Sequence, residues 1–158
     1  MKYIKYFFQF LIAIICLIIF KILGAHKSSD LSGKIFEFIG PYFRSKKLIY
    51  SNILKAYPNI DKKKLKKITN LMWNNYGRVF AEFMFIKDFR SGKLASNVKI
   101  EGLNILKDIK LSNKQVIFIS GHFSNFELMA MYIEKSGINL SAIYRPLNNI
   151  FLNKIMER

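Results

Sequence analysis

The sequence predicts an α/β protein that begins with a membrane helix, continues with a helical segment and ends in the start of a mixed or parallel sheet. Three observations support this fold class. Residues 1–25 contain a long apolar run, residues 26–90 carry apolar side chains at helical spacing, and residues 96–158 alternate between extended and helical patterns. With 158 residues, the chain has the size of one domain with a modest core.

Residues 1–25 are predicted to form an N-terminal membrane anchor. Residues 6–20 carry no charge, two lysines precede them, and Lys21 can extend its amine to the membrane surface. A cleaved signal peptide is the alternative, because a charged start and an apolar middle also fit one. The apolar run is long for a signal peptide and residues 26–30 offer no convincing small-x-small cleavage site, so we favour an anchor.

The distribution of charge predicts that the body of the chain lies in the cytoplasm. Of the 26 Lys and Arg residues, 23 follow position 21, and basic segments tend to stay on the cytoplasmic side. The net charge of +16 suits anionic lipid, an acidic carrier protein or nucleic acid. Nucleic acid is disfavoured, because the excess of 21 lysines over 5 arginines is typical of a compositional bias and no RRM, KH, zinc or helix-turn-helix signature is present.

Residues 26–90 are predicted to be helical. The pattern indicates a short amphipathic helix over residues 31–43, broken near its end by a Gly-Pro pair, and a second over residues 46–57 that a proline ends. Asp61 is a favourable N-cap for a long third helix. The first two turns of that helix are crowded with lysines that form a solvated face or contact lipid phosphate, namely Lys62, Lys63, Lys64, Lys66 and Lys67.

Residues 96–158 are predicted to contain a β-α-β core. A short strand is expected at residues 98–101 and a helix at residues 103–109. Residues 115–120 are apolar on both faces, as expected of a strand buried within a sheet, and residues 140–144 form the next strand. A helix connects these last two strands, so they are expected to be parallel.

The candidate chemistry lies in the segment between the buried strand and that helix, Gly121-His122-Phe123-Ser124-Asn125-Phe126-Glu127. Ser124 or Asn125 is expected to cap the helix, which Gly137 ends. His122 then lies at the carboxyl edge of the sheet, and Glu127 can fold back to orient the imidazole as a base. Such a pair can move an acyl group directly onto a hydroxyl. The spacing alone favours a plainer alternative, a partly buried loop histidine with a satisfied hydrogen bond.

No metal and no cofactor are predicted for this site. One histidine and one glutamate are too few ligands for a zinc site, and Gly121 stands alone instead of forming a glycine-rich nucleotide loop. The single cysteine, Cys16, lies in the apolar run, where a thiol is a poor nucleophile, and is interpreted as a packing residue.

Several separated segments resemble one family, the lipid A biosynthesis acyltransferases, within the wider H-x4-D/E acyltransferase superfamily. The matching segments are the apolar anchor, residues 74–78 with Glu82, residues 98–103, residues 121–127 and residues 144–149. This resemblance implies a sheet of the glycerolipid-acyltransferase type and makes residues 26–158 a partial acyltransferase domain.

The resemblance also implies the reaction and its partners. The acyl donor would be carried by acyl carrier protein, and the acceptor would be a hydroxyl of a lipid A precursor, often one that bears Kdo sugars. The enzyme would sit in the bacterial inner membrane with anionic lipid around it and its catalytic portion on the cytoplasmic side. His122 would be the base and Glu127 its orienter. Arg145, Asn125 and Arg78 would bind substrate, although the plain alternative for Arg78 is a surface pair with the glutamate four residues later.

Members of this family usually run to about twice this length. The chain is therefore interpreted as truncated, and as the amino-terminal half of the full enzyme. We expect residues 1–158 alone to be poorly soluble outside detergent, and to transfer acyl chains only when a complementary carboxyl-terminal half is supplied. Two alternatives stay open. One is a glycerolipid acyltransferase with the same H-x4-E chemistry, and the other is an inactive membrane-anchored remnant.

Overall fold

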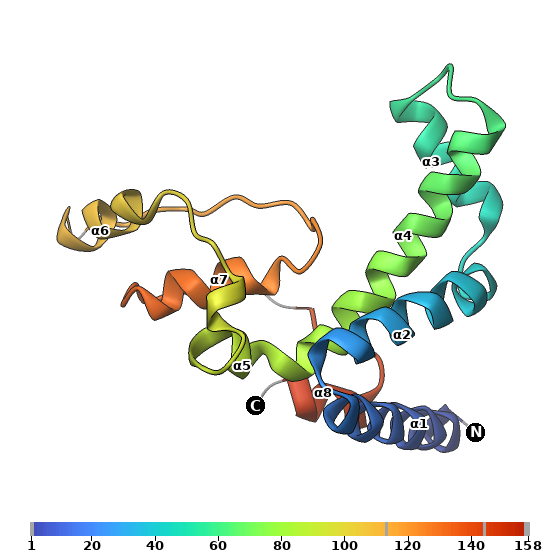
Figure 1. Ribbon diagram of the computed structural model, residues 1–158, viewed down its shortest axis with the longest axis horizontal. Coiled ribbons are helices and arrows are strands. Elements are labelled where there is room, and N and C mark those ends of the chain that lie inside the picture. The colour runs from blue at the N-terminus through green and yellow to red at the C-terminus, as the bar shows by residue number, and fades with distance from the viewer. Residues whose placement is uncertain (1, 113, 144, 157–158) are drawn as a thin grey trace.

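The computed structural model describes residues 2–112, 114–143 and 145–156, and helices dominate these ranges (Figure 1). The α-helices are α1 (Lys2–Leu23), α2 (Ala25–Ile39), α3 (Lys46–Ala56), α4 (Lys62–Glu82), α5 (Ile86–Ser91), α6 (Leu103–Ser112), α7 (Glu127–Lys135) and α8 (Ile150–Met156). Short 3-10 helices follow α2, α4 and α5 as η1 (Gly40–Tyr42), η2 (Phe83–Phe85) and η3 (Ala95–Asn97).

The predicted anchor is a single apolar helix, α1. Its 22 residues extend for about 33 Å at 1.5 Å per residue. By length and composition it could cross a membrane, which supports membrane association. The helix stops at Gly24, whose φ of 78° lies in the left-handed region that favours glycine, and α2 starts directly after it.

Helices α2 and α4 pack closely because small residues separate them. Ser28 and Ser32 of α2 are fully buried. A Cβ atom added to Gly77 of α4 would lie 2.3 Å from the carbonyl oxygen of Ser32, so only glycine allows this approach. The predicted start of this helix at residue 31 was therefore wrong. The helix begins at residue 25, and two serines ahead of residue 31 are buried in it: Ser28 is fully buried and Ser29 donates to Glu82 of α4.

The other predicted helices of the amino-terminal part are confirmed. The Gly-Pro pair ends α2, and α3 spans residues 46–56. Asp61 caps α4 as predicted, since its Oδ1 accepts a hydrogen bond of 2.8 Å from the backbone N–H of Lys64. Helix α4 rises away from α1, so that its lysine-rich start lies at the far end of the molecule from the apolar helix (Figure 1).

The predicted sheet is not confirmed, since the described residues contain no strand. Residues 98–101, 115–120 and 140–143 are irregular, and residue 144 lies outside the described part. Ile117 and Ile119, expected inside a sheet, are 90% and 92% exposed. A strand is stable only when a neighbouring strand satisfies its backbone groups, and no described segment pairs with these three. The intervening helices α6 and α7 do form.

Helix α7 is held against α5 by polar contacts. The hydroxyl of Tyr132 donates to the carbonyl oxygen of Phe89 at 3.1 Å. Arg90 forms an ion pair with Glu134, which lowers the pKa of that carboxyl by hydrogen bonding from the guanidinium. Gly137 ends α7 with a φ of 81°, as predicted. These contacts connect the segment that carries the predicted motif to the helical body.

Candidate active site

The predicted motif forms a tight turn that leads into α7. The backbone N–H of Phe123 donates to the carbonyl oxygen of Gly121 at 2.9 Å, and Ser124 adopts a φ of 45° in the left-handed region. The predicted side-chain cap at Ser124 or Asn125 was wrong, because Phe126 occupies the N-cap position without a side-chain hydrogen bond. The side chain of Asn125 is engaged elsewhere.

His122 and Glu127 lie close in sequence but are not paired. The His122 side chain is exposed, and its ring lies against that of Phe126 with 4.2 Å between the centroids. Glu127 is half-buried as the first residue of α7. Both residues are described, and the structure records no hydrogen bond or ion pair between them. The imidazole is therefore accessible, and the orienting role of Glu127 stays a prediction.

Glu82 connects the motif to two helices. Its Oε2 accepts a hydrogen bond of 3.2 Å from the side-chain amide of Asn125. Its Oε1 accepts one of 2.8 Å from the hydroxyl of Ser29 in α2. Both carboxylate oxygens at the end of α4 are thus occupied, and the motif turn is fastened to the α2–α4 pair through one side chain. Since Glu82 carries this contact, it is a positioning residue for the turn.

Arg78 lies beside this connection but does not pair with Glu82. Its Nη1 lies 2.7 Å from Oδ1 of Asp30 and donates to the Ser29 hydroxyl at 3.3 Å. Its Nε donates to Oδ1 of Asn74 at 2.7 Å. The anticipated surface pair with the glutamate four residues later is therefore absent from the contacts of this described arginine. Arg78 instead joins α4 to α2, and it is linked to the motif through Ser29 and then Glu82.

Two residues of this network were not identified as site residues from the sequence. Ser29 and Asp30 carried no motif, and their importance comes from an α2 that starts earlier than predicted and brings both next to α4. The one available signal was the pattern of small residues in this stretch, which is typical of close helix packing.

Arg145 is a predicted site residue that the structure does not connect to the hydrogen-bonded network of Asn125, Glu82, Ser29 and Arg78. Its side chain is exposed, and no hydrogen bond or ion pair joins it to the described residues. Nor do the described residues contain a group of three or more His, Cys, Asp or Glu side chains that could hold a metal ion.

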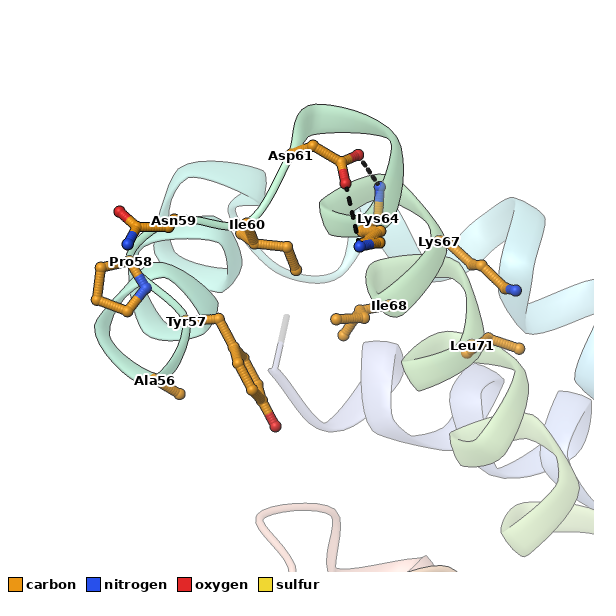
Figure 2. Close-up of a pocket in the computed structure, with 10 residues that line it drawn as sticks. All are labelled: Ala56, Tyr57, Pro58, Asn59, Ile60, Asp61, Lys64, Lys67, Ile68 and Leu71. Atoms are coloured by element: carbon orange, nitrogen blue, oxygen red, sulfur yellow. Dashed lines mark hydrogen bonds and ion pairs between the residues drawn. The ribbon is translucent and has the colours of Figure 1, made fainter.

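Two cavities differ in their relation to the motif. One of about 680 Å³ lies at the turn between α3 and α4, where Tyr57, Ile60 and Leu71 line it beside Lys64 and Lys67 (Figure 2). It is remote from the motif. A second cavity of about 410 Å³ lies between α6, α7 and the irregular segments, and Leu128, the residue after Glu127, is part of its lining. Its lining is mostly apolar, with Ile100, Ile105, Leu106, Phe118, Leu128, Met129 and Ile133.

Comparison with known proteins gives one family. A family model described as bacterial lipid A biosynthesis acyltransferase matches residues 1–158, which is the whole chain. No curated protein and no solved structure matches the chain. The match includes the motif turn, the Asn74 to Glu82 segment and the apolar helix, the segments whose resemblance to this family was noted from the sequence.

Proposed function

The chain belongs to the bacterial lipid A biosynthesis acyltransferase family, and on that premise we propose that its His122 site transfers a fatty acyl chain from acyl carrier protein to a hydroxyl of a lipid A precursor. Membership of this family implies an acyltransferase of lipid A biosynthesis. The observation that carries the finer proposal is the exposed imidazole of His122 on a turn anchored by the Asn125–Glu82 hydrogen bond. An acceptor hydroxyl can reach such an imidazole from solvent or membrane.

In the proposed reaction, His122 removes the proton of the acceptor hydroxyl while the oxygen attacks the carbonyl carbon of the acyl thioester. The carbon–sulfur bond breaks, the new ester forms, and the proton passes from the imidazolium to the leaving thiolate. Glu127 orients the imidazole once its side chain turns toward the ring. Backbone N–H groups at the start of α7, or Arg145, stabilise the oxyanion.

Two features support binding of the substrates near this turn. The mostly apolar cavity of about 410 Å³ begins directly after Glu127, which suits an acyl chain whose reacting end lies at His122. The Oδ1 atom of Asn125 is buried and has no hydrogen-bond partner among the described residues. A substrate hydroxyl can satisfy it once a shift of the turn exposes the oxygen, and this is how the amide would bind substrate.

The proposed partners follow from charge. Acyl carrier protein is acidic, and the exposed lysines around the cavity at the α3–α4 turn offer it a basic surface (Figure 2). The same basic excess supports a body on the cytoplasmic side of the inner membrane, with anionic lipid near the lysines of α1. The whole-chain match to a lipid A family favours that acceptor over a glycerolipid precursor.

A second candidate, an inactive membrane-anchored remnant, is favoured by one observation. Ile117, Ile119 and Ile143 are almost fully exposed on irregular segments beside the motif. Apolar side chains in that state favour a site that lacks its neighbouring strands and needs a further protein segment before it can act.

The experiment is an acyl-transfer assay with membranes that contain the chain, alone and together with a carboxyl-terminal segment of a family member. Replacement of a general base typically lowers the rate by about 10² to 10⁴, so His122→Ala should abolish the acylated product. The matched control is His26→Ala, which removes the other histidine, in α2, and should leave the product unchanged. Equal product from both variants would refute the proposed role of His122. Absence of product in every arm would favour the inactive remnant.

A further inference from the structure

Helix α1 is attached to the rest of the chain near both of its ends. At its start, the side-chain amide of Asn149 donates to the carbonyl oxygen of Tyr6 at 2.9 Å, and the Phe151 ring lies 5.8 Å from that of Phe10. Toward its end, Leu17 and Phe20 are buried against Ala81 of α4. The helix is therefore fastened to the body at two places along its length, near Tyr6 and near Phe20.

The opposite side of α1 is apolar and uncovered. The exposed residues there recur at helical spacing and include Ile4, Phe8, Leu11, Ile15, Ile18 and Ile22, of which Ile22 is 80% exposed. No charged or amide side chain interrupts this row. The side chain of Gln9 points toward Asn149 instead, and its Oε1 lies 3.4 Å from Nδ2 of Asn149. The helix thus has one face for the body and one continuous apolar face.

These attachments conflict with a helix that crosses the bilayer along its axis. Tyr6 and Lys21 are separated by about 22 Å along the helix at 1.5 Å per residue. In a crossing helix this stretch would span most of the hydrocarbon core, which is about 30 Å thick. A crossing helix would carry α8 deep into that core, together with Asn149 and the exposed Lys154. A charged side chain at that depth costs at least a few kcal/mol.

We propose that α1 lies in the plane of one membrane leaflet, with the Ile4 to Ile22 row in the acyl chains of the bilayer and both ends of the helix on the cytoplasmic side. This inference rests on the proposed membrane association of α1 and not on acyl transfer. Lys2, Lys5 and Lys21 lie at the two ends of the helix, where they can meet anionic headgroups.

The orientation also gives the site a place. Ala81 packs on α1, and the adjacent Glu82 holds the motif turn through Asn125. The turn is therefore linked to α1 through two adjacent residues, Ala81 and Glu82, and the proposed orientation places it at the level of the headgroups. A lipid hydroxyl can reach His122 there without leaving the membrane surface.

The test maps both ends of α1 with a membrane-impermeant maleimide. In a Cys16→Ser background, which removes the chain's single cysteine, the full chain carries one new cysteine at a time. Tyr3→Cys reports the start of α1, with Lys5→Cys as a second position. Lys55→Cys reports the body, and Ile15→Cys reports the apolar face. Each variant is labelled in sealed inside-out and right-side-out vesicles from the expressing bacterium.

We expect Tyr3→Cys, Lys5→Cys and Lys55→Cys to be labelled in inside-out vesicles, with nearly complete loss of labelling in right-side-out vesicles. Ile15→Cys should be protected in both until detergent is added. Labelling of Tyr3→Cys and Lys5→Cys from the face opposite to Lys55→Cys would overturn the in-plane orientation and show a crossing helix. Free labelling of Ile15→Cys without detergent would overturn membrane insertion of α1 itself, whatever the outcome of the acyl-transfer assay.

Discussion

Replacing Gly77 by alanine should separate α2 from α4 and loosen the candidate site. The added Cβ atom would lie 2.3 Å from the carbonyl oxygen of Ser32 and 2.8 Å from Cβ of Phe36. The nearest atom belongs to the backbone of a helix, so no side-chain rotation can relieve the contact. The two helices must move apart by about 1 Å to restore an ordinary van der Waals distance.

The free energy of unfolding should fall by about 2 kcal/mol. Overpacking of a tight interface costs about 1 to 3 kcal/mol, and the higher helix propensity of alanine offsets about 1 kcal/mol of that cost. The separation also strains the Ser29–Glu82 hydrogen bond, which contributes about 1 kcal/mol. The Arg78–Asp30 ion pair adds little because solvent reaches both side chains, which are 40% and 62% exposed.

The assay is thermal unfolding of the full chain in detergent, followed by helical circular dichroism. For a domain of this size, a loss of 2 kcal/mol lowers Tm by about 4 to 8 °C. Ser32→Ala is the matched control at the same interface. It removes a buried hydroxyl that has no hydrogen-bond partner among the described residues, so Tm should stay unchanged or rise. A Tm for Gly77→Ala at or above that of the unchanged chain would refute the close approach of the two helices.

Two further predictions concern the start of α4. The double change Lys63→Glu and Lys67→Glu should weaken binding of acyl carrier protein, measured by fluorescence anisotropy at several salt concentrations. The same charge change at Lys107 and Lys110 of α6 is the control and should leave binding unchanged. Equal loss of binding from both pairs would show that net charge alone is responsible. Hydrogen bonding from the backbone N–H of Lys64 lowers the pKa of Asp61, so its contribution to stability is present above the unfolded pKa of about 4 and is lost as the pH falls through the folded value. Asp61→Asn keeps a capping side chain and should remove this pH dependence of Tm, and an unchanged acid profile would contradict the assignment.

The helical part of the fold could be predicted because its signals are local. Asp61 caps α4 with its own side chain, and Gly137 supplies the positive φ that ends α7. Both effects act within a few residues of the chain. The early start of α2 could not be predicted in this way, since Ser28 and Ser32 favour a helix there only through their packing against a segment about 45 residues later.

The predicted strands depended on partners that local patterns cannot supply. Residues 115–120 are apolar on both faces, which correctly identifies side chains that favour burial, but a strand also needs a neighbouring backbone. Among the described residues that neighbour is missing, and Ile117 and Ile119 point into solvent. The continuous apolar run therefore identified a segment that favours burial, but it did not predict that the segment would be irregular in this structure.

The site shows the same division between local and distant effects. The motif residues His122 and Glu127 were recognisable in the sequence, but the contact that fixes their turn comes from Glu82, which is more than 40 residues away. Glu82 also accepts from Ser29, and its neighbour Ala81 packs on the apolar helix. One end of α4 thus joins the motif turn, α2 and the membrane-facing helix. In the proposed orientation of α1, Ala81 and Glu82 are thus the two adjacent residues that link the membrane-bound helix to the His122 turn, and the membrane becomes part of the setting of the proposed site.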